Sequence, residues 1–253
     1  MVRSHGSPRS RPHRGAVHTK PPRGVLLDVD GTLLDSNEQH ARAWVEALRE
    51  HDVLVLASEI RRLIGTGGDK ILPRVGIAEE SERGRSVKAR RKVIFRERYL
   101  PTCRPFAGAR GLVAHMRDEG LVVAVATSSE KDDLAALLHA AGVHDLIDDA
   151  ATSSDAEKSK PDPDIVVAAA GRTALAPELL VLLGDTPYDV DAAARAGIRA
   201  VAVRCGGWAD VDLGGAVAIY DDPRELLALY DASPFGRARP DASARTIRHA
   251  ARG

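Results

Sequence analysis

Two carboxylates stand directly after a short apolar run, where the packing of a core cannot account for them. Residues 24–36 read Gly-Val-Leu-Leu-Asp-Val-Asp-Gly-Thr-Leu-Leu-Asp-Ser, so that Asp28 and Asp30 follow a run typical of a buried strand. A turn at Gly31 lets both carboxylates reach one bound phosphate or metal ion. Neighbouring carboxylates repel each other unless a cation lies between them, and their oxygen atoms suit Mg²⁺. The stretch therefore predicts chemistry that uses paired carboxylates and a hard cation.

Three further polar motifs stand where an apolar run ends or where a helix is expected to begin. Thr127 and Ser128 close one apolar run, and free backbone N–H groups at the start of a helix bind anions readily. Lys160 lies in Lys-Pro-Asp-Pro, where two prolines restrict the backbone and can hold an ammonium group in place. Asp185 and Asp189 close another apolar run, in Gly-Asp-Thr-Pro-Tyr-Asp. Taken singly, each motif also has a structural explanation, such as a helix cap or a solvated turn.

Together the four motifs resemble those of the haloacid dehalogenase-like (HAD) hydrolase superfamily, most of whose members are phosphatases. Residues 28–32 resemble its signature DxDGT, and residues 184–189 resemble its fourth motif, GDxxxD. Thr127 or Ser128 falls at the second motif and Lys160 at the third. All four occur in the family's order, and the resemblance extends over most of the chain.

The resemblance implies a reaction that proceeds through a covalent intermediate. Asp28 would attack phosphorus and form an aspartyl-phosphate, which divides one difficult displacement into two easier ones. Asp30 would protonate the leaving oxygen and then deprotonate the hydrolytic water. Lys160 would neutralise charge on the nucleophile and on the phosphate. The namesake dehalogenases lack an acid at the position of Asp30, so its presence favours phosphate ester chemistry.

The same resemblance implies a Mg²⁺ cofactor and a set of groups that hold the substrate. The cation would be bound by the side chains of Asp28 and Asp185 and by the carbonyl oxygen of Asp30. Asp189 would orient a metal-bound water or the lysine. The residues expected to bind the phosphate or the rest of the substrate are Gly31, His40, Lys70, Thr127 and Ser128.

The body of the chain alternates strand-like and helix-like segments, which predicts an α/β fold. This alternation favours a Rossmann-like parallel sheet with helices on both faces. An all-helical block interrupts it after the first strand, and ligands bind beyond the carboxyl ends of such strands. The block is therefore expected to be a cap over the site, as in HAD enzymes of the helical-cap type. The expected organisation is a basic tail at 1–23, a core at 24–36 and 105–233, a cap at 37–104 and a second basic tail at 234–253.

Composition and charge bound the class of protein. The chain has 253 residues, of which 44% are hydrophobic, so it can bury a sizeable core. Its two cysteines, and the lack of an apolar run of membrane-spanning length, favour a cytoplasmic protein without membrane partners. The net charge of zero hides tails of +6 at 1–23 and +4 at 234–253, which are expected to be disordered. Nucleic acid is not the expected partner, because no aromatic residues are interleaved with the arginines.

The favoured interpretation is a phosphatase that acts on a small phosphorylated metabolite, and there are two alternatives to it. Residues 35–44 resemble the cap entry of β-phosphoglucomutase, whose histidine, here His40, can contact the catalytic acid; related phosphatases share that pattern. The mutase also grips a distal phosphate with a cap arginine, and the loop 65–70 offers glycine instead, which favours a hydrolase. In this loop Lys70 could bind an anionic substrate such as phosphoglycolate. The other alternative is a non-enzymatic binding protein that retains the fold. No feature of the sequence specifies an oligomeric state.

Overall fold

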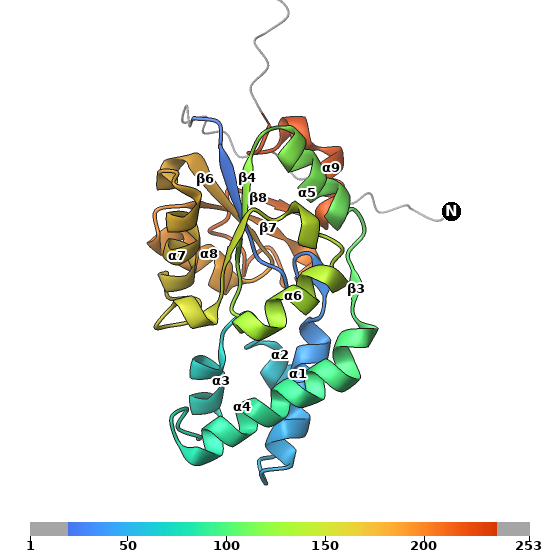
Figure 1. Cartoon of the computed structure of the whole chain (residues 1–253), viewed down its shortest axis with the longest axis vertical. Helices are drawn as coiled ribbons and strands as arrows, with labels where there is room; N and C mark the ends of the chain where they lie inside the picture. The colour runs from blue at the N-terminus through green and yellow to red at the C-terminus, as the bar shows by residue number, and fades with distance from the viewer. Residues whose placement is uncertain (1–19, 237–253) are drawn as a thin grey trace, which may run out of the picture.

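The computed structural model describes residues 20–236 and has an α/β fold built on a six-stranded sheet (Figure 1). The strand order is β5-β4-β1-β6-β7-β8, and every neighbouring pair is parallel. This arrangement confirms the predicted parallel sheet. The strands are β1 (Gly24–Leu27), β4 (Val122–Ala126), β5 (Asp149–Ala151), β6 (Leu180–Gly184), β7 (Arg199–Val203) and β8 (Ala218–Tyr220).

Helices cover both faces of the sheet, as Figure 1 shows. One face is covered by α7 (Asp164–Thr173) and α8 (Pro187–Arg195), whose apolar residues join those of the strands in one buried cluster. The other face is covered by α5 (Ala109–Asp118), α6 (Lys131–Ala140) and α9 (Pro223–Ala228). The protein core therefore consists of two apolar layers separated by the sheet.

The central strand β1 contributes to both layers. Val25 and Leu27 belong to the cluster that contains residues of α5, α6 and α9, whereas Leu26 belongs to the cluster that contains residues of α7 and α8. All three side chains are fully buried. Because β1 pairs with β4 on one side and β6 on the other, it has no solvent-facing edge. This position explains the continuous apolar run that ends at Asp28.

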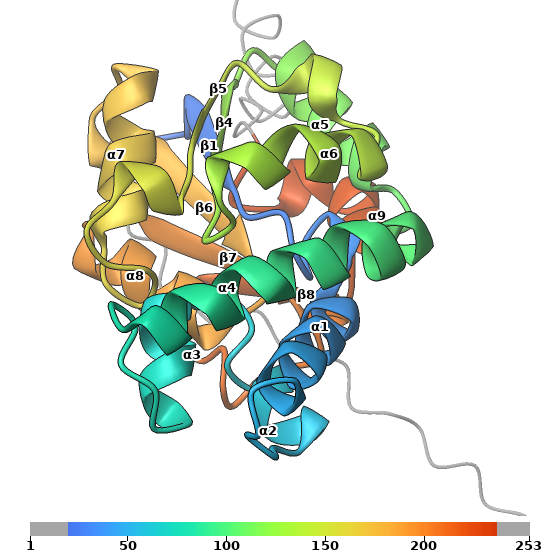
Figure 2. The ribbon, with the colours of Figure 1, turned by 60° about the horizontal axis from the view of Figure 1, so that its bottom comes forward.

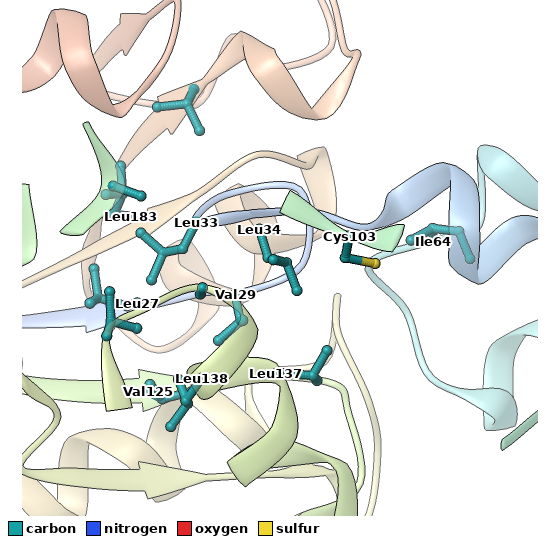
Figure 3. Close-up of a cluster of buried hydrophobic side chains, with 14 of the residues drawn as sticks. Leu27, Val29, Leu33, Leu34, Ile64, Cys103, Val125, Leu137, Leu138 and Leu183 are labelled. Atoms are coloured by element: carbon teal, nitrogen blue, oxygen red, sulfur yellow. The ribbon is translucent and has the colours of Figure 1, made fainter. Parts of the chain in front are cut away.

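Apolar side chains also anchor the loop that follows β1 (Figure 3). Val29, Leu33 and Leu34 are fully buried in the same cluster as Leu27. The carbonyl oxygen of Val29 accepts the N–H groups of Leu33 and Leu34 at 2.9 and 3.0 Å, which closes a tight turn. Packing of Val29 thus fixes the backbone between two carboxylates.

Between β2 (Leu34–Asp35) and β3 (Arg104–Pro105) the chain forms the cap, which lies beyond one end of the sheet (Figure 1, Figure 2). Helix α1 packs against α2 and α4, and the buried side chains of Trp44, Leu48 and Val87 belong to the core that they share. The helix α4 runs directly into a short π-helical segment, Phe95–Tyr99. The cap helices are α1 (Asn37–Arg49), α2 (Ala57–Arg61), α3 (Gly68–Arg74) and α4 (Glu82–Ile94).

The two connections between the cap and the sheet run side by side. They form the antiparallel pair β2 (Leu34–Asp35) and β3 (Arg104–Pro105), with Leu34 opposite Pro105. The sequence did not predict this pair, nor the edge strands β5 and β8. Each of these elements has only two or three residues, which is too short for a period-two pattern.

The C-terminal boundary of the ordered core lies later than expected. Phe235, which falls within the predicted tail 234–253, is 2% exposed and stacks on Tyr230 with ring centroids 6.1 Å apart. The rest of that tail, and the predicted tail 1–23 up to residue 19, lie outside the described residues. Within residues 20–236, no helix is both long enough and apolar enough to span a membrane.

We expect Leu26→Ala to lower the free energy of unfolding by about 2–5 kcal/mol, because it leaves a cavity at the centre of the sheet. Leu54→Ala is the matched control: Leu54 is 86% exposed, and its truncation should change stability by less than about 0.5 kcal/mol. Urea unfolding followed by circular dichroism measures both. Equal losses in the two variants would contradict the packing described for β1.

Candidate active site

Charged side chains from distant parts of the chain meet at the carboxyl ends of β1 and β6. The ammonium group of Lys160 lies 2.7 Å from Asp28 Oδ1 and 2.6 Å from Asp189 Oδ1. Carboxylate oxygens of Asp28, Asp185 and Asp189 lie within 4.8 Å of one another. Lys160 and Asp185 have no exposed surface at all. The structure therefore brings the predicted nucleophile, lysine and acidic residues into one buried cluster.

A helix start positions Asp189. Thr186 precedes α8, and its hydroxyl accepts the N–H of Asp189 at 3.2 Å and donates to Asp189 Oδ2 at 2.7 Å. Pro187 is the first residue of the helix, where its missing N–H costs nothing. This capping arrangement uses one oxygen of Asp189 and leaves the other for Lys160.

The cluster holds more negative than positive charge. Burial raises the pKa of Asp28 to about 7, although Lys160 opposes that shift. Burial, and then the charges of Asp28 and Asp189, raise the pKa of Asp185 well above its usual range. The hydroxyl of Thr32 lies 3.1 Å from one oxygen of Asp28 and 3.1 Å from one of Asp185. Burial makes these carboxyl groups difficult to ionise, and a divalent metal ion bound to their oxygens would stabilise the ionised forms. The cluster is therefore suited to bind such an ion.

Asn37 is a polar contact to this cluster that sequence reasoning missed. Its Nδ2 donates to Asp185 Oδ2 at 2.9 Å, and the residue is 2% exposed. A Cβ atom on Gly31, where φ is +83°, would lie 2.0 Å from that Nδ2. A Cβ atom on Gly206 would lie 1.8 Å from Asp185 Oδ2. Glycine at both positions thus leaves the space that Asp185 and its amide partner occupy.

Asp30 is held separately from the cluster, by three hydrogen bonds. Its Oδ1 contacts Ser36 Oγ at 2.5 Å and His40 Nε2 at 2.9 Å, and its Oδ2 accepts the hydroxyl of Ser129 at 2.8 Å. Burial alone would raise the pKa of Asp30, but His40 and the two hydroxyls outweigh it and lower the pKa below its usual range. Ser36 and Ser129 were not predicted as site residues, because a serine beside a helix start usually serves as a cap.

Above Asp30 lies a group of cap side chains that includes an unpredicted arginine. The ring of His40 stacks on Phe95 with centroids 3.8 Å apart, and its Nδ1 lies 3.5 Å from Arg91 Nη2. The guanidinium of Arg91 also lies 5.4 Å from the ring centre of Trp44. Its buried Nε has no hydrogen-bond partner among residues 20–236. In the sequence, Arg91 is one of several basic residues on a polar helix, which is also typical of a solvated face.

The predicted phosphate-binding hydroxyls line a small pocket beside the two carboxylates that are predicted to be catalytic. The pocket has a volume of about 30 Å³ and is bordered by Asp28, Asp30, Thr127 and Ser128. Ser128 Oγ donates to the cap carbonyl oxygen of Gly65 at 2.9 Å, so the hydroxyl ties the core to the cap.

The structure places Lys70 away from this pocket. Its ammonium group lies 2.6 Å from Asp162 Oδ2 and 3.7 Å from Asp69 Oδ2. Lys70 borders a different cavity, beside α8. Lys70 is thus paired with one core and one cap carboxylate, and its contact with the substrate stays a prediction.

The chain is similar in sequence to a known family of hydrolases and to several phosphatases. Residues 25–203 match the family model described as haloacid dehalogenase-like hydrolase. The chain is 30% identical over 189 residues to "Probable phosphatase IndB" of Dickeya dadantii, covering 72% of this chain and 81% of that protein. It is 26% identical over 211 residues to the phosphoglycolate phosphatase of Rhodospirillum rubrum, covering 79% and 88%.

A further relative is much longer than this chain. SUPPRESSOR OF QUENCHING 1 of Arabidopsis thaliana is 36% identical over 187 residues, which is 71% of this chain but 18% of that chloroplastic protein. Among solved structures, a hydrolase from Pseudomonas syringae superposes with a TM-score of 0.78 at 29% identity, covering 84% of this chain and 99% of that one. With the family model matching most of its length, this chain belongs to the haloacid dehalogenase-like hydrolase family.

Proposed function

We propose that the protein is a Mg²⁺-dependent phosphatase that hydrolyses a small phosphate monoester through an aspartyl-phosphate on Asp28. One observation carries this proposal: Asp28 borders a pocket, and its Oδ1 lies within hydrogen-bond distance of the ammonium group of Lys160. A carboxylate so placed can attack phosphorus while the ammonium group offsets the charge that gathers there. The relatives that are named as phosphatases support the same reaction class.

Lys160 controls the charge of the nucleophile. Burial favours the neutral form of Asp28, and a neutral carboxylic acid is a poor nucleophile. The ammonium group of Lys160 favours the ionised form, and Asp189 holds that ammonium from the opposite side. We infer that Asp189 acts through Lys160 and does not itself touch the substrate.

Mg²⁺ is the cation that best fits the oxygen-only donor set of this cluster. Asp28 and Asp185 would hold it, together with the carbonyl oxygen of Asp30. Asp189 accepts three hydrogen bonds, from Lys160 and from the N–H and the hydroxyl of Thr186, whereas Asp28 and Asp185 each accept two and share the hydroxyl of Thr32. Asp189 is therefore the least available of the three clustered carboxylates. When bound, the cation neutralises charge on the transferring phosphoryl oxygens.

Asp30 is suited to proton transfer in both half-reactions. Its low pKa in this conformation makes it an ionised base that can deprotonate the hydrolytic water. A phosphate dianion beside it raises that pKa, because a like charge disfavours ionisation. Substrate binding thus favours the protonated form, which then donates to the leaving oxygen.

The two alternatives, a phosphosugar mutase and a non-enzymatic binding protein, differ from a phosphatase in how much phosphate they release. A mutase resembling β-phosphoglucomutase would interconvert hexose phosphates faster than it releases phosphate, and a binding protein would release none. The contact between His40 and Asp30 suits both a mutase and a phosphatase.

The proposal is tested by Mg²⁺-dependent release of phosphate from p-nitrophenyl phosphate. We expect Asp28→Asn to lower kcat by about three orders of magnitude or more, since the amide cannot form the phosphoenzyme. Chelation of Mg²⁺ with EDTA should abolish release by the unmodified protein. Asp118→Asn is the control, because Asp118 is an exposed carboxylate at the end of α5. Full turnover by Asp28→Asn would remove the assignment.

Asp30→Asn should separate the two proton transfers. p-Nitrophenolate leaves without a proton, so this variant should still release a burst of about one equivalent and then stall as phosphoenzyme. With an alkyl phosphate, which needs a proton donor, the burst should disappear or slow by about 10²-fold or more. Rapid-quench kinetics measure both bursts. Equal burst rates for the two substrates would show that Asp30 is not the acid.

Lys160→Met should destabilise the metal-free protein by about 3–5 kcal/mol at pH 8, because it leaves buried carboxylates without a counterion. Without Lys160 the folded-state pKa of Asp28 rises further above its unfolded value. Stability conferred by a raised carboxyl pKa is present at low pH and is lost as the pH rises through that folded pKa. The loss should therefore be smaller at pH 5 than at pH 8.

Urea unfolding in EDTA at the two pH values measures this difference. Lys158→Met is the matched control, because Lys158 is exposed two residues away in the same loop. A loss for Lys160→Met that is independent of pH would contradict the proposed charge balance.

A further inference from the structure

A larger cavity adjoins the catalytic pocket. It has a volume of about 460 Å³, within the range of small-molecule sites. Because the reacting phosphorus would lie over Asp28, the adjoining space is where the alcohol part of the ester would lie. The two spaces share the side chains of Trp44, Thr66, Arg91, Ser128 and Ser129.

The wall of this cavity is rich in hydroxyl groups, most of which already donate their hydrogen atom to a protein acceptor. Five of its hydroxyls donate to protein acceptors; for example, Thr66 donates to the carbonyl oxygen of Leu63 at 2.7 Å. Each such oxygen keeps lone pairs that can accept a further hydrogen bond. The wall therefore favours ligand groups that donate, such as alcohols and ammonium groups. The lining hydroxyls belong to Thr66, Ser128, Ser129, Ser153, Ser154 and Ser159.

The charges of the wall also disfavour a second anionic group on the substrate. Of its two cations, Lys88 is paired with Glu79 at 2.6 Å, and Arg91 lies at the junction with the catalytic pocket, where the phosphate would be. Glu80 and Glu157 form no ion pair within the described part of the chain. A second anionic group on the substrate would thus meet carboxylates and find no free cation beyond Arg91. The lining carboxylates are Asp69, Glu79, Glu80, Glu130 and Glu157.

We propose that the substrate is the phosphate ester of a polyhydroxylated alcohol of sugar size, neutral or bearing an amine, and not a phosphorylated carboxylic acid. This inference rests on the proposed phosphatase function and adds a substrate class to it. The apolar part of the lining is limited to Trp44 and Ala156, so a large aromatic leaving group is disfavoured. Glu80 and Glu157 are assigned as residues that exclude a second negative charge.

Two matched pairs of substrates test the class. Glucitol 6-phosphate and 6-phosphogluconate differ only in a CH₂OH group that becomes a carboxylate. 2-Hydroxyethyl phosphate and 2-phosphoglycolate differ in the same way at smaller size. We expect kcat/KM for the hydroxyl member to exceed that for the carboxylate member by about tenfold or more within each pair. Glucosamine 6-phosphate should be hydrolysed at least as well as glucose 6-phosphate. A carboxylate member that equals or exceeds its partner overturns the inference.

A charge-neutralising variant tests the cause of the preference. The double variant Glu80→Gln/Glu157→Gln should lower the glucitol 6-phosphate to 6-phosphogluconate ratio roughly 2- to 10-fold, and the effect should shrink in high salt. Asp118→Asn removes a charge that is also exposed but lies outside the cavity lining, and it should leave the ratio unchanged. A ratio that responds equally to both changes overturns the assignment of the two glutamates.

The outcomes separate this inference from the proposed function. If p-nitrophenyl phosphate is not hydrolysed, or is hydrolysed without Asp28, then the phosphatase proposal fails. If its hydrolysis depends on Asp28 and Mg²⁺ but carboxylate substrates are preferred, then only the substrate class fails.

Discussion

The site depends on the ion pairs that the buried ammonium group of Lys160 forms with carboxylates. It lies between Asp28 and Asp189, and a third carboxylate, Asp185, lies close by. One ammonium cannot balance three carboxylates, and the raised pKa values of Asp28 and Asp185 express that imbalance. The fold can hold such a cluster only with bound protons or with an added cation. The proposed affinity for a divalent ion would therefore follow from the burial of these residues as much as from their number.

Asp30 is controlled by a different set of contacts, from three separate segments. Ser129 belongs to the loop after β4, Ser36 lies between β2 and α1, and His40 lies on α1. The predicted nucleophile, Asp28, is thus positioned by the core alone, whereas the predicted acid is positioned by core and cap together. The same cap surface carries Arg91 and part of the lining of the larger cavity, whose other part comes from the core loops 128–130 and 153–159. In the proposed reaction, proton transfer by Asp30 and recognition of the leaving group would therefore both depend on the contact between core and cap.

The sequence predicted those features that depend on local pattern combined with a general rule of topology. Apolar runs located β1, β4, β6 and β7, and parallel strands end at one edge, so Asp28 and Asp185 were expected to meet. Asn37 and Arg91 could not be recognised, because each occupies an ordinary helix position and only the tertiary fold brings it to the site. Lys70 illustrates a contact that its loop pattern could not show: a carboxylate 92 residues away in the chain pairs with it, and its contact with the substrate stays a prediction.

The antiparallel pair β2 and β3 has a mechanical consequence. Because the two strands that link cap and sheet are paired with each other, any bending there would occur about one shared axis, and the four cap helices would move as a single body. His40 would then part from Asp30 in the same movement in which Gly65 parts from Ser128. Two contacts between core and cap beside the pocket would therefore open and close together, since one hinge would carry both.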